Sequence, residues 1–362
     1  MSCKCNKNYF KIILWGIVSF IKKSFISDCE GPLSLNDNAF ELAEEFIVSG
    51  NEFFTKLSNF DDYLVIDVKK ENYHAGDTLK LLAPFLKASG ICNQDVIDFS
   101  KEHIFMVPGA VKTLEFVSKS LPGFIVSTSY EQYISALCDV VNFPFKNTYH
   151  TTMDLDKYSL SDSEKNRLLE FKESILKEDY EGIYDIFFNQ LSKMEINQLL
   201  ESVHTVGGVG KRIAVEDIMD KYELDPNGIM YMGDSITDVE ALEFAKKHNG
   251  LAISFNGNSF ALDQAEIAII SDNTIISSIL IDLHIKYDKT EIIRFIKEYN
   301  MDVLKALEIF DIKEDLVTEF KEIFPEEYPI LKLINEDNKE ELIRISEEFR
   351  KNIRGETIGG LG

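Results

Sequence analysis

Two carboxylates one residue apart, Asp28 and Glu30, follow a short apolar run and precede a Gly-Pro turn in the stretch Phe25-Ile-Ser-Asp-Cys-Glu-Gly-Pro32. Residues two apart at the end of a strand point the same way, so both side chains can lean over one crevice. Two carboxylates buried together repel each other, so we expect a cation or a shared proton beside them. The alternative is a surface turn after an edge strand, which is the commoner context of an isolated Asp-x-Glu.

Other groups able to do chemistry also follow apolar runs or begin helices. Ser127 and Thr128 end the run Phe-Ile-Val, Lys211 stands at the head of an expected helix, and Asp234 and Asp238 follow the strand-like Ile-Met-Tyr-Met-Gly. A lone residue of any of these kinds is more often a turn or a surface charge. Their shared position at strand ends and helix heads favours a single polar site.

The Gly-Lys pair that ends at Lys211 does not form a nucleotide-binding P-loop. That motif requires Gly five residues before its final Gly and Ser or Thr after the Lys. Thr205 and Arg212 occupy those two places. We therefore assign Lys211 to the polar site alone.

Strands and helices alternate through most of the chain, which predicts an α/β fold with a doubly wound, Rossmann-like parallel sheet. The expected strands are short apolar runs, at 24–27, 124–129, 229–233, 251–254 and 267–270. The carboxyl ends of such strands face one crevice. This topology would bring Asp28, Ser127 and Asp234 together.

Apolar residues three and four apart predict helical additions to this sheet, and from about Asp282 onward the pattern predicts helices without strands. The expected division is an N-terminal extension at 1–23, an α/β core at 24–35, 105–159 and 204–282, a helical cap at 36–104, a helical insertion at 160–203, a C-terminal helical region at 283–354 and a Gly-rich flexible tail at 355–362.

The 362-residue chain carries a formal net charge of −24 and a pI near 4.7. Such a charge excludes a broad surface for nucleic acid or an anionic membrane, because phosphate backbones would be repelled. A small phosphorylated substrate remains compatible if a cation and a Lys neutralise it locally. The five cysteines show no paired zinc spacing and predict free thiols in a reducing cytoplasm.

The N-terminus superficially resembles a signal peptide, because three lysines precede the apolar run Ile12–Ile21. That run is too short to span a bilayer, and Lys22-Lys23 stands where a small-residue cleavage site would be. We expect no stable membrane insertion. A short interfacial helix, or a start codon placed upstream of the true one, are the alternatives for this extension.

The motifs, in this order, resemble those of the haloacid dehalogenase (HAD) superfamily of phosphatases and phosphotransferases. They are Phe25-Ile-Ser-Asp-Cys-Glu-Gly, Phe124-Ile-Val-Ser127, Lys211, and Met232-Gly-Asp-Ser-Ile-Thr-Asp238. The resemblance covers roughly 24–33 and 107–281, with 36–102 in the place of the family's helical cap, as in phosphoserine-phosphatase-like members. The Asp-Cys-Glu-Gly-Pro variant and the C-terminal helices further resemble an archaeal HAD-like group that includes the R subunit of a methanogen energy-converting hydrogenase.

The resemblance implies a phosphoric monoester hydrolase that works through an aspartyl-phosphate. Asp28 would be the nucleophile and Glu30 the general acid and base. Ser127, Thr128 and Lys211 would bind the transferring phosphoryl group.

The resemblance also implies a Mg²⁺ ion as cofactor. Its protein ligands would be Asp28, the backbone carbonyl of Glu30, and Asp234. Asp238 would complete the metal group by supporting Lys211 or a metal-bound water.

Two departures from the family pattern put efficient hydrolysis in question. Glu30 stands where family phosphatases carry Asp, and Pro32 stands where Thr is usual. An acid misplaced by about 1 Å can cost roughly 100-fold in rate. We therefore expect a phosphatase acting on a small phosphorylated metabolite. One alternative is a catalytically weak accessory subunit that docks on a larger, hydrogenase-type complex through its helical additions. Another is a phosphotransferase or mutase. The substrate is not readable, because function lives in the site and the cap and not in the fold.

Overall fold

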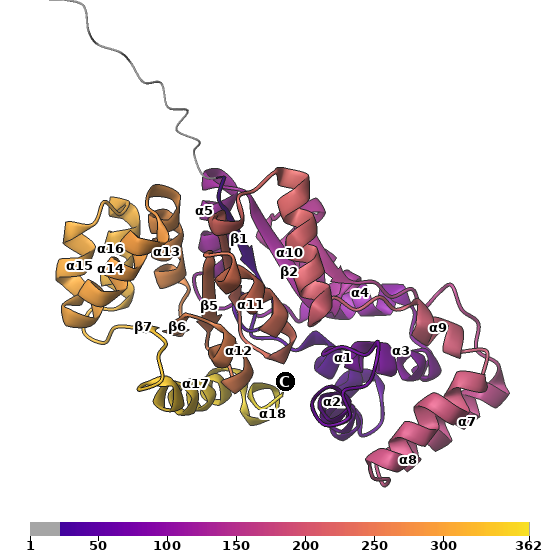
Figure 1. The fold of residues 1–362 in the computed structure, drawn as a ribbon. Coiled ribbons are helices and arrows are strands. Elements are labelled where there is room, and N and C mark those ends of the chain that lie inside the picture. The colour runs from indigo at the N-terminus through magenta and orange to yellow at the C-terminus, as the bar shows by residue number, and fades with distance from the viewer. Residues whose placement is uncertain (1–21, 362) are drawn as a thin grey trace, which may run out of the picture.

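The computed structural model describes residues 22–361, which form one seven-stranded sheet in the order β3-β2-β1-β4-β5-β6-β7 (Figure 1). The first six strands in that order are parallel, and only β6 and β7 pair antiparallel. The predicted α/β, doubly wound sheet is confirmed. The strands are β1 (Ser24–Ser27), β2 (Gly123–Tyr130), β3 (Thr148–Thr151), β4 (Ile229–Gly233), β5 (Leu251–Phe255), β6 (Ile267–Ile270) and β7 (Ile330–Leu333). The predictions for residues 1–21 lie outside the described residues.

Alternate residues of the central strands enter two different apolar clusters. Phe25 and Ile125 face the cluster completed by α5 (Ala110–Ser120), α6 (Glu131–Val141) and α13 (Ile275–Lys286). Ile26 and Val126 face the cluster completed by α10 (Val209–Tyr222) and α11 (Val239–Lys247). Helices therefore cover both faces of the sheet, which explains why the strands are almost continuously apolar.

The two helical insertions share one apolar cluster. The rings of Phe53 and Phe85 lie 4.8 Å apart, and those of Phe85 and Phe187 6.0 Å apart, so the contact joins residues from both insertions. Figure 1 shows these helices at one end of the sheet. They are α1 (Asn38–Phe46), α2 (Gly50–Ile66), α3 (Thr78–Ser89), α4 (Asn93–Glu102), α7 (Asp162–Ile175), α8 (Tyr180–Asp185) and α9 (Asn197–Ser202). We call this cluster with its helices the cap.

Two helices begin at polar residues whose side chains bond the first turn. Asp37 is the N-cap of α1 and accepts a hydrogen bond from the backbone N–H of Phe40. Ser161 is the N-cap of α7, and its hydroxyl accepts a hydrogen bond from the backbone N–H of Glu164. The carboxylate of Glu164 accepts a hydrogen bond from the backbone N–H of Ile196. The apolar run at 63–66 forms the last turn of α2.

The prediction that no strand follows Asp282 is wrong, because β7 pairs with β6. The strand Ile330–Leu333 is only four residues long, so its sequence shows no clear strand periodicity. It forms because the edge of β6 offers backbone hydrogen-bond partners. The short, polar β3 was likewise not predicted. The helices of this half are α12 (Ser259–Gln264), α14 (Lys289–Met301), α15 (Val303–Ile309), α16 (Glu314–Ile323), α17 (Lys339–Arg354) and α18 (Glu356–Gly359).

Residues 355–361 do not form the flexible tail that their glycines predict. They include α18, and Ile358 and Leu361 pack against the cap. Figure 1 shows this yellow segment between α17 and the cap helices. The C-terminal segment thus lies between the end of the sheet and the cap.

No helix within residues 22–361 is both long enough and apolar enough to cross a membrane.

Candidate active site

Asp28 begins the loop that follows β1, in the centre of the sheet. Its backbone N–H donates to the carbonyl of Met232 over 2.8 Å, which continues the pairing of β1 with β4. Its Oδ1 accepts from the N–H of Cys29 at 2.6 Å, and its Oδ2 accepts from Nζ of Lys211 at 2.6 Å. Burial raises the pKa of Asp28 to about 8, although Lys211 opposes this effect.

Gly31 allows the loop after β1 to approach Asp234. Its φ of +100° lies in the region that favours glycine. A Cβ atom at this position would lie 2.1 Å from Oδ2 of Asp234. The Gly of the Asp-Cys-Glu-Gly motif is therefore required by both conformation and space.

Lys211 lies in the first turn of α10, and its residue is 0% exposed. Besides the bond to Asp28, its Nζ donates to Oδ1 of Asp238 over 2.8 Å. Burial lowers the pKa of Lys211, but Asp238 and Asp28 outweigh burial and raise it overall. The amine is therefore held as an ammonium between two carboxylates.

Asp238 is saturated by donors from its own loop and from β4. Its Oδ1 accepts from the hydroxyl of Tyr231 at 2.7 Å, and its Oδ2 accepts from the backbone N–H groups of Asp234 and Ser235. Burial raises the pKa of Asp238, but Lys211 and these donors lower it overall. This carboxylate is suited to holding Lys211 and the loop in place.

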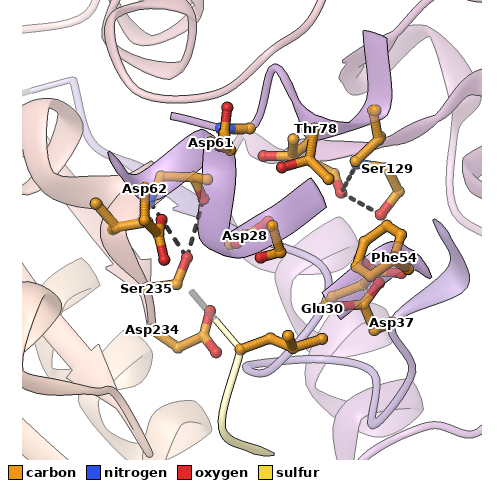
Figure 2. Close-up of a pocket in the computed structure, with 18 of the residues that line it drawn as sticks. Asp28, Glu30, Asp37, Phe54, Asp61, Asp62, Thr78, Ser129, Asp234 and Ser235 are labelled. Atoms are coloured by element: carbon orange, nitrogen blue, oxygen red, sulfur yellow. Dashed lines mark hydrogen bonds between the residues drawn. The ribbon is translucent and has the colours of Figure 1, made fainter. Parts of the chain in front are cut away.

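A row of hydroxyl groups lies beside Asp28 at the end of β2. The hydroxyl of Ser127 donates to that of Ser129 over 2.9 Å and accepts from the N–H of Ser129. The buried Oγ1 of Thr128 has no hydrogen-bond partner among the described residues. All three residues, with Asp28 and Asp234, line a cavity of about 110 Å³ (Figure 2). The row can donate hydrogen bonds to an anion in that cavity.

Glu30 lines the same cavity but is also tied to the cap. Its Oε1 accepts from the N–H of Asn38, the first residue of α1, at 2.7 Å. Burial, followed by repulsion from Asp37, raises the pKa of Glu30 well above its ordinary value. A carboxyl group in this state can keep its proton near neutral pH and then donate it.

Carboxylate oxygens of Asp28, Asp234 and Asp238 lie within 4.8 Å of one another. Because Asp238 is saturated, the carboxylates of this cluster that could hold a cation are those of Asp28 and Asp234. Oxygen donors of this kind suit Mg²⁺. The structure thus brings together every residue predicted for the site, with Asp238 in a supporting position.

Sequence reasoning missed two arginines of α17. Arg350, 3% exposed, donates from Nη1 to Oδ2 of Asp234 and also to its backbone carbonyl, the latter over 3.2 Å. Nη1 of Arg354 lies 3.5 Å from the same Oδ2. Their spacing of four on an amphipathic helix places them on one face, but only the fold shows that this face meets the site.

Burial raises the pKa of Asp234, and Arg350 and Arg354 oppose that rise. In Figure 2 the yellow C-terminal ribbon runs beside Asp234, opposite the acidic residues contributed by the cap. The site is therefore closed by three parts of the chain: the strand ends, the cap and the C-terminal segment.

One solved structure resembles nearly the whole chain. It is the gene product AF1437 from Archaeoglobus fulgidus, with a TM-score of 0.80 and 27% identity over 94% of this chain and 99% of that one. At this coverage the similarity must include most of the C-terminal helices as well as the sheet. No protein-family model matches the sequence, and no curated protein matches it.

Phosphoserine phosphatase is a much weaker structural match. Its substrate complex has a TM-score of 0.46 with 14% identity, covering 72% of this chain and 97% of that one. A phospho-aspartyl intermediate analogue of phosphoserine phosphatase has a TM-score of 0.46 with 15% identity, covering 72% and 98%. TM-scores below 0.5 do not by themselves establish a shared fold, so the chemistry of this chain has to be argued from its own site.

Proposed function

We propose that the protein is a Mg²⁺-dependent phosphatase of the HAD type that hydrolyses a small phosphorylated metabolite. The observation that carries the proposal is that Lys211 is fully buried and shared between Asp28 and Asp238, while Asp28 lines one cavity with the hydroxyl row of β2. A nucleophilic carboxylate and hydroxyl donors at one cavity, with an ammonium bonded to that carboxylate, are the groups that phosphoryl transfer through an acyl-phosphate requires.

In the first half of the reaction, a carboxylate oxygen of Asp28 attacks phosphorus and the bond to the leaving alcohol breaks. Glu30 donates its proton to the departing oxygen. Lys211, Ser127 and Thr128 stabilise the charge on the phosphoryl oxygens. The products of this half are the free alcohol and an aspartyl-phosphate.

In the second half, Glu30 accepts a proton from water as the water oxygen attacks phosphorus. The bond between phosphorus and Asp28 breaks, which releases inorganic phosphate and restores the carboxylate and the protonated Glu30. Mg²⁺, held by Asp28, Asp234 and the Glu30 carbonyl, would neutralise charge on the phosphoryl group.

The test is a screen of the purified protein against phosphorylated metabolites with and without Mg²⁺. We expect phosphate release from at least one monoester, dependent on Mg²⁺ and abolished in Asp28→Asn. Release that persists unchanged in Asp28→Asn would refute the proposal.

A second function, an accessory subunit with little catalysis, is favoured by the arginine contact to Asp234 and by apolar side chains exposed on the C-terminal helices. Met301 is 71% exposed, and Leu304 and Ile309 are also exposed on α15. We propose these helices as the docking surface in that case. Absence of Asp28-dependent turnover on every phosphate would favour this alternative.

We further propose that the protein works in the cytoplasm. Among the described residues, Cys29, Cys92 and Cys138 are all free thiols, which fits a reducing compartment. The resemblance to the archaeal group with a hydrogenase subunit stays a prediction.

A further inference from the structure

We propose that Arg350 and a divalent cation compete for Asp234, so that the C-terminal segment, residues 355–361, closes the site only in the cation-free state. The inference rests on the metal site of the proposed function. It adds that Arg350 takes the place of the metal at Asp234 when no cation is bound.

The first support is the identity of the oxygen that Arg350 takes. Arg350 donates to Oδ2 of Asp234, and Oδ2 is the Asp234 atom nearest to the Cβ position of Gly31. That oxygen therefore lies beside Gly31, in the loop that carries Asp28 and Glu30. A cation shared by Asp28 and Asp234 would bind the carboxylate that Arg350 and Arg354 already contact.

The second support is the balance of charge. Asp28, Asp234 and Asp238 carry three negative charges when ionised, and Lys211 supplies one positive charge among them. A divalent cation would supply the remaining two. Arg350 and Arg354 lie at Asp234, and Asp37 and Glu30 also face Arg354, so a cation added to the closed site would meet two guanidinium groups in a buried setting.

Every guanidinium nitrogen of both arginines donates at least one hydrogen bond to another residue of this chain. Nε of Arg350 donates to the carbonyl of Gly359, and Nη2 donates to that of Leu361. Nε of Arg354 donates to the carbonyl of Leu35, and Nη2 to that of Asn36. The arginines therefore serve Asp234 and the closure itself.

These bonds couple Asp234 to the closure of the cavity. Arg350 holds the turn that carries Leu361, and Leu361 lines the cavity while packing against the cap. The rest of α17 is anchored independently, because Ser346 donates to the carbonyl of Gly257 and Glu347 accepts from the N–H of Ser259. Release of Arg350 would therefore free the C-terminal segment without detaching the helix.

The experiment measures binding of Mn²⁺ by electron paramagnetic resonance to wild type, Arg350→Gln and a matched control, Arg344→Gln. Arg344 lies on the same helix, is exposed and pairs with Glu348. If the closed state holds 90–99% of the molecules, Arg350→Gln should bind Mn²⁺ roughly 10- to 100-fold more tightly than wild type. Arg344→Gln should bind it like wild type.

A second measurement needs no variant. Amide hydrogen exchange of wild type with Mn²⁺ should accelerate at residues 359–361, whose N–H groups bond within the α18 turn, and stay unchanged in the first turns of α17. Equal Mn²⁺ affinity of wild type and Arg350→Gln, with unchanged exchange at 359–361, would overturn the competition while leaving the proposed function intact. Failure of every variant to bind Mn²⁺ would overturn the metal site and the competition together.

Discussion

Nζ of Lys211 lies 2.6 Å from Oδ2 of Asp28, although 183 residues separate the two in the chain. The contact depends on β1 and β4 ending side by side and on α10 placing its first turn over them. It gives Asp28 a fixed positive neighbour where burial alone would favour its protonated form. A carboxylate with this neighbour can attack a phosphate without an approaching anion being repelled.

Asp28→Asn should lose both turnover and the phosphoenzyme, because an amide cannot form the acyl-phosphate. We expect a fall in kcat of about 10⁴-fold or more, the scale seen when a nucleophile is removed. Phosphate release and acid-quenched labelling with ³²P-substrate would measure the two effects. Asp98→Asn, an exposed position on α4, is the control for the loss of one charge and should behave as wild type.

The residues of the candidate site could be predicted because each signal is local. Asp28, Ser127 and Asp234 follow apolar strands, and parallel strands bring their carboxyl ends together whatever lies between them. For Lys211, the sequence had only to predict a helix whose first turn contains it. The convergence of these residues therefore followed from short local patterns, whereas the strand order, β3 and β7 did not.

The role of the C-terminal segment could not be predicted in this way. Arg350 contacts Asp234 across 116 residues, and nothing near Arg350 distinguishes it from a solvated arginine on an amphipathic helix. β7 likewise forms because β6 offers an edge, and residues 355–361 are ordered by Arg350 and the cap in spite of their glycines. Each of these features depends on a partner that is distant in sequence.

Gly31→Ala should destabilise the protein and displace Asp234, whereas Gly90→Ala should only destabilise it. Both glycines have positive φ, +100° and +91°, so backbone strain should destabilise each alanine variant by about 1–2 kcal/mol. Only at Gly31 would the new methyl meet a carboxylate, and overpacking of this kind adds about 1–3 kcal/mol. At Gly90 no atom lies within 4 Å.

Urea unfolding would give the free energies for this glycine pair, and Mn²⁺ binding would report the position of Asp234. We expect Gly90→Ala to retain Mn²⁺ affinity and Gly31→Ala to lose it. Equal stability and equal Mn²⁺ affinity of the two variants would show that Gly31 is not needed for the approach of Asp234.

Asp61→Asn should change how stability depends on pH. Burial raises the pKa of Asp61 to about 7, and its Oδ1 has no hydrogen-bond partner among the described residues. Because the folded-state pKa lies above the unfolded value near 3.9, the proton stabilises the native state below about pH 4, and this contribution is lost as pH rises through 7. The Asn variant has no proton to lose.

The free energy of unfolding of Asp61→Asn minus that of wild type should therefore increase by about 2–4 kcal/mol as the pH rises from 4 to 8. Urea unfolding of both proteins at several pH values in that range measures this difference in free energy. The other buried carboxyl groups contribute equally to both proteins, so their contributions cancel. Glu52→Gln on the exposed side of the same helix removes a charge without touching the cavity and serves as control. A constant difference between Asp61→Asn and wild type across the range would contradict the assignment.

Glu30→Asp addresses the residue at which this chain departs from the usual acid of the HAD family that its motifs resemble. The longer side chain of Glu30 reaches the N–H of Asn38, so the acid is positioned by the cap as well as by its own loop. An Asp at this position is one methylene shorter and cannot hold that bond and also reach the leaving oxygen. We expect kcat to fall by roughly 10- to 100-fold with little change in KM, because the lost interaction is made only in the transition state.

Glu30→Gln is the matched variant, since it keeps the length and an accepting oxygen but cannot transfer a proton. It should slow poor leaving groups more than good ones, whereas Glu30→Asp should lower kcat for both because the acid is misplaced. Steady-state kinetics on a series of phosphate monoesters with graded leaving-group pKa separates the two patterns. If Glu30→Asp instead turned over generic monoesters several-fold faster than wild type, the longer acid would be a device that restrains hydrolysis, and the accessory-subunit function would gain support.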